Sequence, residues 1–429
     1  MHKIISKASK GLFGDIEVPG DKSISHRALI IGSMCNGPVM INNMSSALDC
    51  LATVTCLKQL GVEIERKSPT EVTIIGKGQD GYSEPRDVLH AHNSGTTMRL
   101  LSGLLAGQPF YSILTGDASL NRRPMTRVIS PLSQMGAVIY SAHNNTYPPM
   151  TIIGRNLHPI EYSMPIASAQ VKSAILIAGL QCLGKTIVIE KVKSRDHTER
   201  MLKYLSGNIE NGTTRVSIFG GKLKPRNIAV PGDISSAVYY ITAGLLVPNS
   251  KIKIRNVGIN DTRIGFIKAL NDMGATIKIN QTDIKNEEPF GDMEIESSEL
   301  KAINIGTERI PSMIDEIPLL ALAATQAQGQ TIISGARELR YKESDRLRSI
   351  ATELRRLGAN IIENEDGLEI FGPTLLKGAE VETYGDHRIV MTMAIAGLIA
   401  SGETVVKNTE PVAISFPEFF NILESICGN

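Results

Sequence analysis

Residues 57–64 read LKQLGVEI, and five later stretches of the chain repeat this pattern. In each copy, two apolar residues at helical spacing lead to a small residue and then to a short strand-like run. The later copies are LSQMGAVI (132–139), LKYLSGNI (202–209), LNDMGATI (270–277), LRRLGANI (354–361) and LESICGN (423–429), with Ser206 and Cys427 in place of the glycine. The copies start 75, 70, 68, 84 and 69 residues apart, which predicts six compact supersecondary units rather than a short-repeat solenoid.

Each copy is preceded in its repeat by an apolar run that is too apolar for a surface helix and predicts a buried one. The runs are ALIIGSM (28–34), LLSGLLAG (100–107), AILIAGL (174–180), AVYYITAGLL (237–246), IPLLALAA (317–324) and IVMTMAIAGLIA (389–400). A helix-ending residue such as Gly37 and a β-rich run follow each of them. Each repeat is therefore predicted to be an αβαβ unit with at least one extra strand, in an α/β protein.

A chain of 429 residues is long for one hydrophobic core, so two domains are expected. The two halves echo each other, because VPGDKSISHRA (18–28) and VPGDISSAVYY (230–240) share their first four residues. We therefore predict a duplicated three-repeat domain. The N-terminal-half domain spans 21–230, and the C-terminal-half domain combines 1–20 with 231–429. Two domains joined by two connections could close on a ligand.

The composition excludes several functional classes. Apolar residues make up 42% and charged residues 21%, a globular mixture, and 45 Lys and Arg nearly balance 44 Asp and Glu. This balance argues against nucleic acid or a membrane surface as a partner. The five cysteines form no C-x-x-C pair, and the chain shows no apolar signal-peptide core or membrane-length run. We expect a cytoplasmic monomer with reduced thiols and no structural metal.

Small polar and charged residues gather just before each apolar run. These openings read DKSISHR (21–27), NSGTTMR (93–99), SAQVKS (168–173), PGDISS (231–236), SMIDE (312–316) and GDHR (385–388). Ser, Asn and Asp are expected there as N-caps. Capping does not require Lys22, Arg27, Arg99, Lys172 or Arg388, and a cation at a helix start opposes the helix dipole. An anionic ligand would remove this conflict, so the openings predict a site for phosphate or carboxylate groups.

Three other patterns imitate functional motifs. The glycines of residues 76–81 have dinucleotide-fingerprint spacing, but the sequence YSEPRD that follows does not start a helix. His90 and His92 lack a second pair of metal ligands at suitable spacing. The Asp-His pair at 196–197 is sequential, which is a poor arrangement for a proton relay, and no G-x-S-x-G elbow accompanies it. None of the three supports a functional assignment.

Three charged segments are compatible with both a structural and a chemical role. Residues 115–127 (TGDASLNRRPMTR) form either an exposed loop or part of an anion site. In residues 337–349 (RELRYKESDRLRS), the charges either pair in solvent or place Glu343 as a proton-transfer group beside cations. Asp315 and Glu316 open a very apolar helix, where a carboxylate either caps the helix or acts as a base. Residue type alone favours capping.

Eight stretches, in order and at matching spacing, resemble the enolpyruvyl transferases, in particular the branch that acts on shikimate 3-phosphate. They are PGDKSISHRAL (19–29), NSGTTMRLL (93–101), SLNRRPM (119–125), SAQVKSA (168–174), SRDHTERML (194–202), IDEIPLLA (314–321), KESDRL (342–347) and GDHRIVM (385–391). The resemblance covers nearly the whole chain. It implies two domains, each a pseudo-threefold assembly of three βαβαββ units with buried helices, which agrees with the independent repeat count.

The resemblance also implies the chemistry: the enolpyruvyl group of phosphoenolpyruvate is transferred to the 5-hydroxyl of shikimate 3-phosphate, and phosphate is released, on the way to chorismate and the aromatic amino acids. No cofactor or metal is implied. Asp315 matches the proton acceptor at the 5-hydroxyl, Glu343 a proton-transfer residue near the methylene carbon, and Lys22 a catalytic cation that reaches both substrates. The implied substrate-binding residues are Lys22, Ser23, Arg27, Gly95, Arg123, Ser168, Ala169, Gln170, Arg195, Asp315, Lys342, Arg346 and Arg388.

Two departures from the family pattern and two rival functions bear on this interpretation. Ala169 stands where some relatives carry serine, and Ile414 stands where they place a lysine before S-F-P, for which Lys407 is a candidate substitute.

The nearest rival transfers enolpyruvate to UDP-N-acetylglucosamine and uses a loop cysteine, but residues 115–127 contain none. A rival RNA-processing function is disfavoured by the balanced charge and by an aromatic content of only 4%.

Overall fold

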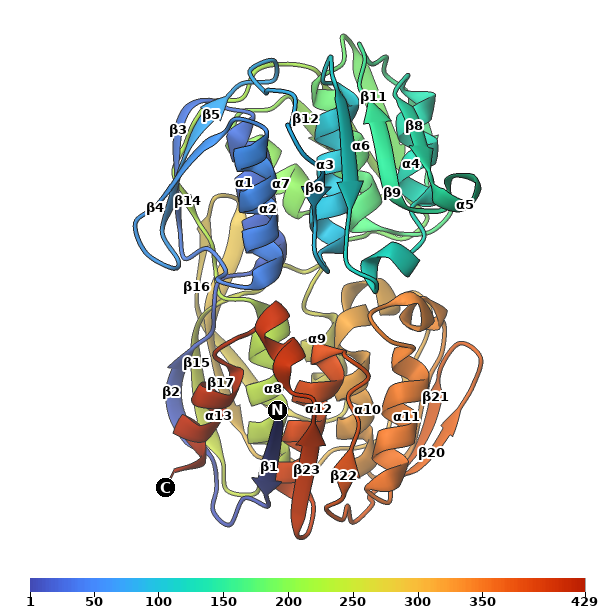
Figure 1. Cartoon of the computed structure of the whole chain (residues 1–429). Coiled ribbons are helices and arrows are strands. Elements are labelled where there is room, and N and C mark those ends of the chain that lie inside the picture. Colours follow the sequence, from blue (N-terminus) through green and yellow to red (C-terminus); the bar gives the residue numbers. More distant parts are fainter. Residues whose placement is uncertain (429) are drawn as a thin grey trace. The chain divides into compact units, whose positions relative to one another are not determined.

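The computed structural model describes residues 1–428, and the chain forms two compact units (Figure 1). Unit 2 consists of Gly20–Pro231 and Ile284–Glu288; unit 1 consists of Met1–Pro19, Gly232–Asp283 and the described chain from Pro289 onward. The predicted ranges differ from these units mainly at Ile284–Glu288. This segment groups with unit 2 because Glu288 Oε1 lies 2.8 Å from His197 Nδ1 and Asn286 Nδ2 donates to the Ala229 carbonyl at 2.6 Å. Asn429, the last residue of the sixth repeat motif, lies outside the described residues.

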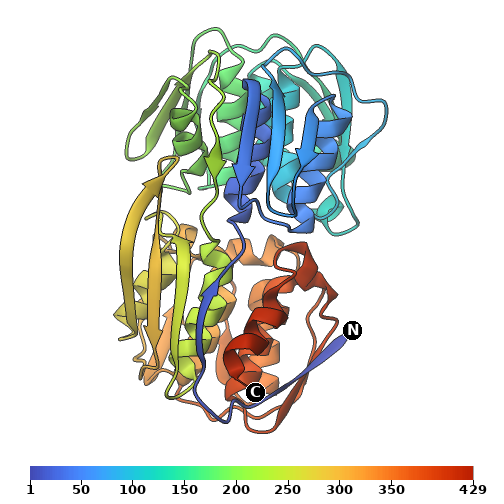
Figure 2. The same cartoon turned by 90° about the vertical axis from the view of Figure 1, so that its left-hand side faces the viewer.

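Unit 2 contains three four-stranded sheets, coloured blue to green in Figures 1 and 2. The first has the order β14 (Ile228–Ala229), β3 (Asn36–Asn42), β5 (Val72–Lys77), β4 (Glu63–Arg66). The second has the order β6 (Leu89–His90), β7 (Tyr111–Thr115), β9 (Tyr147–Ile153), β8 (Val138–Ser141), with the short turn α5 (Ala142–Asn145) between β8 and β9. The third has the order β10 (Glu161–Ser163), β11 (Lys185–Ile189), β13 (Arg215–Phe219), β12 (Ile209–Asn211).

Unit 1 contains three more sheets. Their orders are β16 (Thr276–Lys285), β17 (Glu288–Glu296), β15 (Lys251–Gly258), β2 (Phe13–Glu17); then β18 (Asn304–Ile305), β19 (Gly329–Ile333), β21 (Leu368–Gly372), β20 (Asn360–Glu363); and finally β1 (His2–Ser6), β23 (Glu403–Lys407), β22 (Glu380–Val381). One pairing scheme recurs, in which the strand after a buried helix pairs in parallel with a strand from elsewhere and antiparallel with a later one, as β19 does with β18 and β21. In the last sheet, β1 takes the antiparallel place beside β23.

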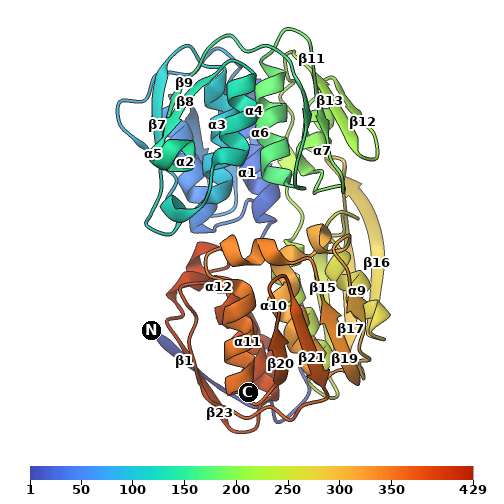
Figure 3. The same cartoon turned by 90° about the vertical axis from the view of Figure 1, so that its right-hand side faces the viewer.

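Each repeat supplies one buried helix and one amphipathic helix. The buried helices are α1 (Lys22–Ser33), α3 (Gly95–Ala106), α6 (Ala169–Leu180), α8 (Ile234–Leu246), α10 (Ile317–Gln326) and α12 (His387–Ile399). The amphipathic ones are α2 (Leu48–Gln59), α4 (Thr126–Gln134), α7 (His197–Tyr204), α9 (Gly265–Asp272), α11 (Arg346–Arg356) and α13 (Phe419–Cys427). In each unit the sheets surround the buried helices, as Figure 3 shows for α3 and α6 between the second and third sheets of unit 2. All six apolar runs thus lie in buried helices, as the sequence predicts.

Side-chain caps fix where most of the buried helices begin. Asp21, Ser94, Ser168, Asp233 and Asp386 each accept a hydrogen bond from a backbone N–H of the first turn, as expected for N-caps. α10 is the exception, because Glu316 occupies its N-cap position without a capping hydrogen bond from its side chain. Capping, the structural role that residue type favours for this carboxylate, is therefore wrong for Glu316.

The repeat motif itself marks the turn that ends each amphipathic helix. The glycine of the first copy, Gly61, has φ 83°, a left-handed conformation that costs glycine little. Ser206 adopts φ 65° at the same place in the third copy, so the turn has the same conformation without a glycine.

Short 3₁₀ segments complete the chain: η1 (Leu120–Arg122), η2 (Ile310–Ser312), η3 (Ile314–Glu316), η4 (Arg337–Tyr341) and η5 (Glu410–Ile414). None of the helices within residues 1–428 is long and apolar enough to cross a membrane.

Candidate active site

In unit 2, the starts of the three buried helices lie together and are joined by side-chain hydrogen bonds. Gln170, at the start of α6, donates to Thr96 Oγ1 of α3 at 2.9 Å. His26 of α1 is connected to α3 through Thr53, whose hydroxyl lies 2.7 Å from His26 Nδ1 and 2.7 Å from Thr97 Oγ1. The first backbone N–H groups of a helix have no intrahelical acceptors. Three helix starts at one place therefore bring together N–H groups of the kind that anions bind in proteins.

Arg27 is buried in this cluster and is held almost entirely by neutral groups. Its Nε donates to Thr198 Oγ1 at 2.7 Å, one Nη donates to Ser173 Oγ at 2.8 Å, and the other donates to the Ser23 carbonyl at 2.8 Å. Burial lowers the pKa of Arg27 to about 10, against the opposing effect of Glu199. The guanidinium therefore remains charged at neutral pH, and its direct partners do not cancel that charge.

Gly95 is the first residue of α3 and leaves space for two arginines. A Cβ built on Gly95 would lie 2.8 Å from Arg99 Nη1 and 3.5 Å from Arg123 Nη1. Arg99 donates to Gln170 Oε1 at 2.6 Å, and Arg123 donates to Asn93 Oδ1 at 2.8 Å. A side chain at position 95 would therefore push into a space that is bordered by cations.

The other predicted residues of unit 2 lie at these helix starts or, for Arg195, in the loop before α7. Lys22 begins α1 and its Nζ is 2.8 Å from Asp49 Oδ2, at the first turn of α2. Ser168 caps α6, and Ala169 is the first residue of that helix. Arg195 lies in the loop before α7 and interacts electrostatically with Arg27. Nine of the predicted binding residues, which we call the unit 2 cluster, thus gather at one end of unit 2: Lys22, Ser23, Arg27, Gly95, Arg123, Ser168, Ala169, Gln170 and Arg195.

In unit 1, Arg346 is a buried centre that connects three carboxylates. Its guanidinium donates to Asp386 Oδ2 at 2.8 Å, to Asp315 Oδ1 at 3.3 Å and to Glu343 Oε2 at 2.5 Å. Lys342 Nζ lies 3.5 Å from the same Asp315 oxygen. Burial lowers the pKa of Arg346. The three carboxylates, Asp386 most of all, raise it by more than burial lowers it, so the pKa of Arg346 lies above its usual range. The arrangement holds two predicted proton-transfer groups on one fixed cation.

Arg388 lies beside this group, in the first turn of α12. Its Nη1 donates to the Ser235 carbonyl at 3.3 Å and lies 3.8 Å from Glu316 Oε1, which also accepts a hydrogen bond from the Ser235 hydroxyl. Burial lowers the pKa of Arg388, while Tyr239 and nearby carboxylates raise it above the usual range overall. We call Asp315, Lys342, Glu343, Arg346 and Arg388 the unit 1 cluster.

Sequence reasoning missed several residues that organise these clusters. Asp386 and Asp49 are the carboxylate partners of Arg346 and Lys22, and the sequence predicts a site role for neither. Asp386 stands in a helix opening, where residue type indicates only a cap, and Asp49 has no signal because it reaches Lys22 from another helix. Lys407, the suggested substitute for the missing lysine, lies 2.7 Å from Glu380 and 3.3 Å from Glu382 at the end of β23, so its own unit already supplies it with anionic partners.

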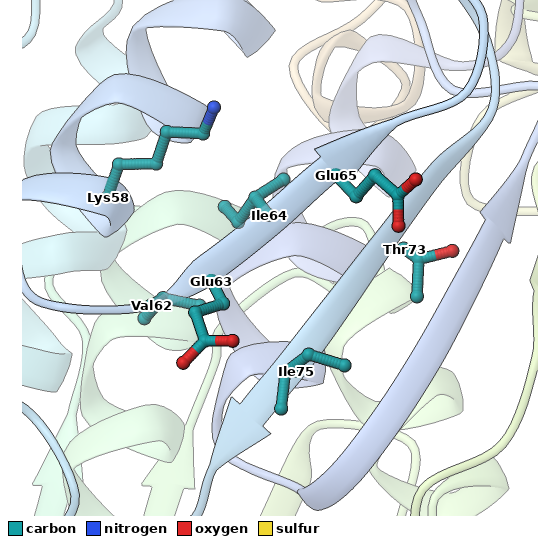
Figure 4. A pocket seen from close by; sticks show the side chains of 7 residues that line it. All are labelled: Lys58, Val62, Glu63, Ile64, Glu65, Thr73 and Ile75. Atoms are coloured by element: carbon teal, nitrogen blue, oxygen red, sulfur yellow. The ribbon is translucent and has the colours of Figure 1, made fainter.

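The remaining surface features do not compete with the two clusters. A depression on the outer face of β4 and β5 is lined by Lys58, Val62, Glu63, Ile64, Glu65, Thr73 and Ile75 (Figure 4). Lys58 is the one cation in this lining and lies at the opposite end of α2 from Asp49. Two carboxylates, Glu63 and Glu65, share the wall with it, so the depression does not suit an anion. Across residues 1–428, no three His, Cys, Asp or Glu side chains are grouped to hold a metal ion.

The fold defines the class of protein first. The enolpyruvyl transferase NikO from Streptomyces tendae has the same fold, with a TM-score of 0.81 over 99% of this chain and 97% of that one. The sequence identity is 16%, so this likeness shows the fold alone. The protein therefore has the predicted α/β enolpyruvyl transferase fold.

The chain belongs to the EPSP synthase (3-phosphoshikimate 1-carboxyvinyltransferase) family, whose sequence profile matches residues 6–423. It is 51% identical over 428 residues to the 3-phosphoshikimate 1-carboxyvinyltransferase of Petrotoga mobilis and 48% identical over 425 residues to that of Bacillus thuringiensis, with 99% of both chains covered in each comparison. EPSP synthase from Acinetobacter baumannii superposes with a TM-score of 0.89 at 41% identity, over 99% of this chain and 98% of that one. The family predicted from the eight stretches is thus confirmed.

Proposed function

We infer that the protein transfers the carboxyvinyl group of phosphoenolpyruvate to the 5-hydroxyl of shikimate 3-phosphate and releases phosphate, in the shikimate pathway to chorismate. The observation that carries this inference is a full-length family match in a chain where Asp315, the predicted base, contacts two cations, Lys342 at 3.5 Å and Arg346 at 3.3 Å. Transfer to UDP-N-acetylglucosamine is disfavoured, because the family match is to the shikimate enzymes.

Charge is the first problem of this reaction, because both substrates carry several negative charges and repel each other. Cations must hold the substrates together before any bond forms. We propose that the unit 2 cluster binds shikimate 3-phosphate, through Lys22, Ser23, Arg27, Ser168, Ala169, Gln170 and Arg195. Lys22, Gly95, Gln170 and Arg123 from unit 2, with Arg346 and Arg388 from unit 1, are the proposed contacts of phosphoenolpyruvate. Buried arginines at helix starts support these roles.

Proton transfer is the second problem. In the addition step, the 5-hydroxyl oxygen bonds to C2 of phosphoenolpyruvate, the hydroxyl loses its proton, and C3 gains one. In the elimination step, the bond from C2 to the phosphate oxygen breaks and C3 loses a proton, which restores the double bond. The two sites of proton transfer are separate, so separate groups are needed. We propose Asp315 at the hydroxyl and Glu343 near C3, with Lys342 as a contact to a substrate hydroxyl.

An acceptor assay tests the function directly. Purified protein is incubated with phosphoenolpyruvate and either shikimate 3-phosphate or UDP-N-acetylglucosamine, and released phosphate is measured. We expect phosphate only with shikimate 3-phosphate. Release with the nucleotide sugar alone would reverse the assignment of the acceptor.

We also propose that the protein works as a monomer in the cytosol. Its cysteines are all free thiols, and Cys35, Cys50, Cys56 and Cys182 are buried, which suits a reducing compartment. Each unit encloses its own hydrophobic core, so a second copy is not required for either core. Sedimentation velocity at assay concentration measures the oligomeric state.

A further inference from the structure

A buried cluster of three charged side chains in unit 2 lies outside the proposed substrate contacts. Lys172 of α6 is only 1% exposed, and its Nζ lies 2.8 Å from Glu190 Oε2 and 2.6 Å from Glu199 Oε1. Burial lowers the pKa of Lys172, but the two carboxylates raise it overall, so the ammonium stays charged. The loss of hydration when three charges are buried offsets much of their mutual electrostatic attraction, so stability alone is a weak reason for the presence of the triad.

The triad fixes the residue that precedes Arg195. Lys172 Nζ donates to the carbonyl of Ser194 at 3.4 Å. Glu190 Oε1 accepts from the backbone N–H of Ser194 at 3.2 Å and from its hydroxyl. The carbonyl, the amide and the side chain of Ser194 are therefore all bound by the triad, and the backbone at Arg195 follows directly from this anchored residue.

The triad also joins the two helices that hold Arg27. Lys172 and Glu199 pair between α6 and α7, and their chain neighbours Ser173 and Thr198 pair in the same way, with hydroxyl oxygens 2.6 Å apart. Those two hydroxyls are the ones that accept hydrogen bonds from Arg27. A change in the spacing of α6 and α7 would therefore move the acceptors that orient the Arg27 guanidinium.

We propose that Lys172, together with Glu190 and Glu199, is a positioning residue that sets Arg27 and Arg195 for the phosphate group of shikimate 3-phosphate. The proposal rests on the function inferred above. It relates two of the eight stretches physically, because residues 168–174 supply Lys172 and residues 194–202 supply Glu199, the two ends of one ion pair. The triad is connected to one proposed contact of phosphoenolpyruvate, Gln170, because both Gln170 and Lys172 lie in α6.

The test is the Lys172→Met variant, with the KM of each substrate measured separately. Methionine fills the space but holds neither the Ser194 carbonyl nor Glu199. We expect the KM for shikimate 3-phosphate to rise about tenfold, which corresponds to ~1.4 kcal/mol of binding. The KM for phosphoenolpyruvate and kcat should stay within about twofold of the parent values, since uniform loss of binding for one substrate leaves the chemical step unchanged. An equal rise in both KM values, or no rise in either, overturns the proposal.

Two further variants keep the test decisive. Glu199→Gln preserves the side-chain shape and leaves Lys172 and Glu190 as an ion pair with no net charge. It should raise the KM for shikimate 3-phosphate by a smaller factor than Lys172→Met does. If Lys172→Met does not fold, Glu199→Gln is the variant that tests the proposal. Lys185→Met removes a more exposed lysine, whose Nζ lies 2.6 Å from Glu210, from the strand next to the triad, and should change neither KM. If the parent protein releases no phosphate, the proposed function fails. If the parent is active and Glu199→Gln matches Lys185→Met, only the positioning role fails.

Discussion

Arg27 of the unit 2 cluster and Arg346 of the unit 1 cluster are held in opposite ways. In the unit 2 cluster, Arg27 donates to two hydroxyls and a carbonyl, all of them neutral. In the unit 1 cluster, Arg346 donates to the three carboxylates of Asp315, Glu343 and Asp386. Both guanidiniums are buried to the same extent, at 2% exposure, so the difference lies in the partners and not in the depth.

This contrast suggests a division of labour. A buried cation with neutral partners keeps its attraction for an anion, which suits the binding of a phosphate group. A cation that already balances carboxylates attracts a further anion less strongly, but it fixes those carboxylates in place beside the proposed phosphoenolpyruvate contact, which suits proton transfer. Lys22 departs from the scheme in unit 2, because it pairs with Asp49 at 2.8 Å. That pairing fits its proposed place at both substrates rather than at the phosphate alone.

The largest effect is expected from Asp315→Ala. If the unit 1 cluster performs proton transfer, loss of this base should lower kcat by about 10³-fold or more, within the range that general acid–base groups contribute. Binding of shikimate 3-phosphate alone should stay within about threefold, because its proposed phosphate contacts lie in unit 2. Rapid-quench turnover and calorimetric titration measure the two quantities.

Asp261→Ala is the matched control in the same unit, because Asp261 is exposed and pairs with the exposed Lys268, and it should leave kcat unchanged. Near-parent turnover in Asp315→Ala would remove this carboxylate from the mechanism. A loss of shikimate 3-phosphate binding as large as the loss of kcat would instead break the proposed division between the clusters.

The next effect concerns stability and compares the two arginines directly. Arg346→Met leaves three buried or half-buried carboxylates without their shared cation, so its unfolding free energy should fall by ~3–5 kcal/mol. Arg27→Met leaves only neutral groups without a donor and should cost about 1–3 kcal/mol. Urea unfolding of both variants, with the parent beside them, measures the difference. Equal losses would mean that the partners do not distinguish the two sites.

The fold could be read from the sequence because its signals are local and repeated six times. Apolar runs, N-caps and a helix-ending turn at each repeat specify elements whose order is fixed by the chain. The sheet pairings are less accessible, since β14 joins β3 from almost two hundred residues away and β1 joins β23 from the other end of the chain. The grouping of Ile284–Glu288 with unit 2 could not be predicted for a similar reason, because the chain on either side of this segment belongs to unit 1.

Some residues of the candidate site could likewise be predicted from the sequence, and others could not. Helix openings with surplus cations pointed to Lys22, Arg27 and Arg388 on physical grounds, and resemblance supplied the remaining roles. The counterions were not predictable, because a carboxylate such as Asp386 is indistinguishable from an ordinary N-cap until Arg346 is seen to reach it. Glu316 shows the converse: its position predicts a cap, yet its side chain accepts from Ser235 instead.

The smallest expected effect is on how the unfolding free energy depends on pH. Burial, and then Lys22 and Arg27 of the unit 2 cluster, hold the pKa of the neighbouring His26 well below its usual range, so the folded protein keeps this imidazole neutral. The unfolded chain takes up a proton near pH 6.5, so the stability from neutral His26 is complete above that pH and is lost as pH falls, by at most ~1.4 kcal/mol per pH unit. Unfolding free energy measured from pH 7 to pH 5.5 should therefore fall more steeply for the parent than for His26→Asn. Parallel curves would show that His26 takes up a proton as readily in the folded protein as in the unfolded chain, which would contradict its burial beside Lys22 and Arg27.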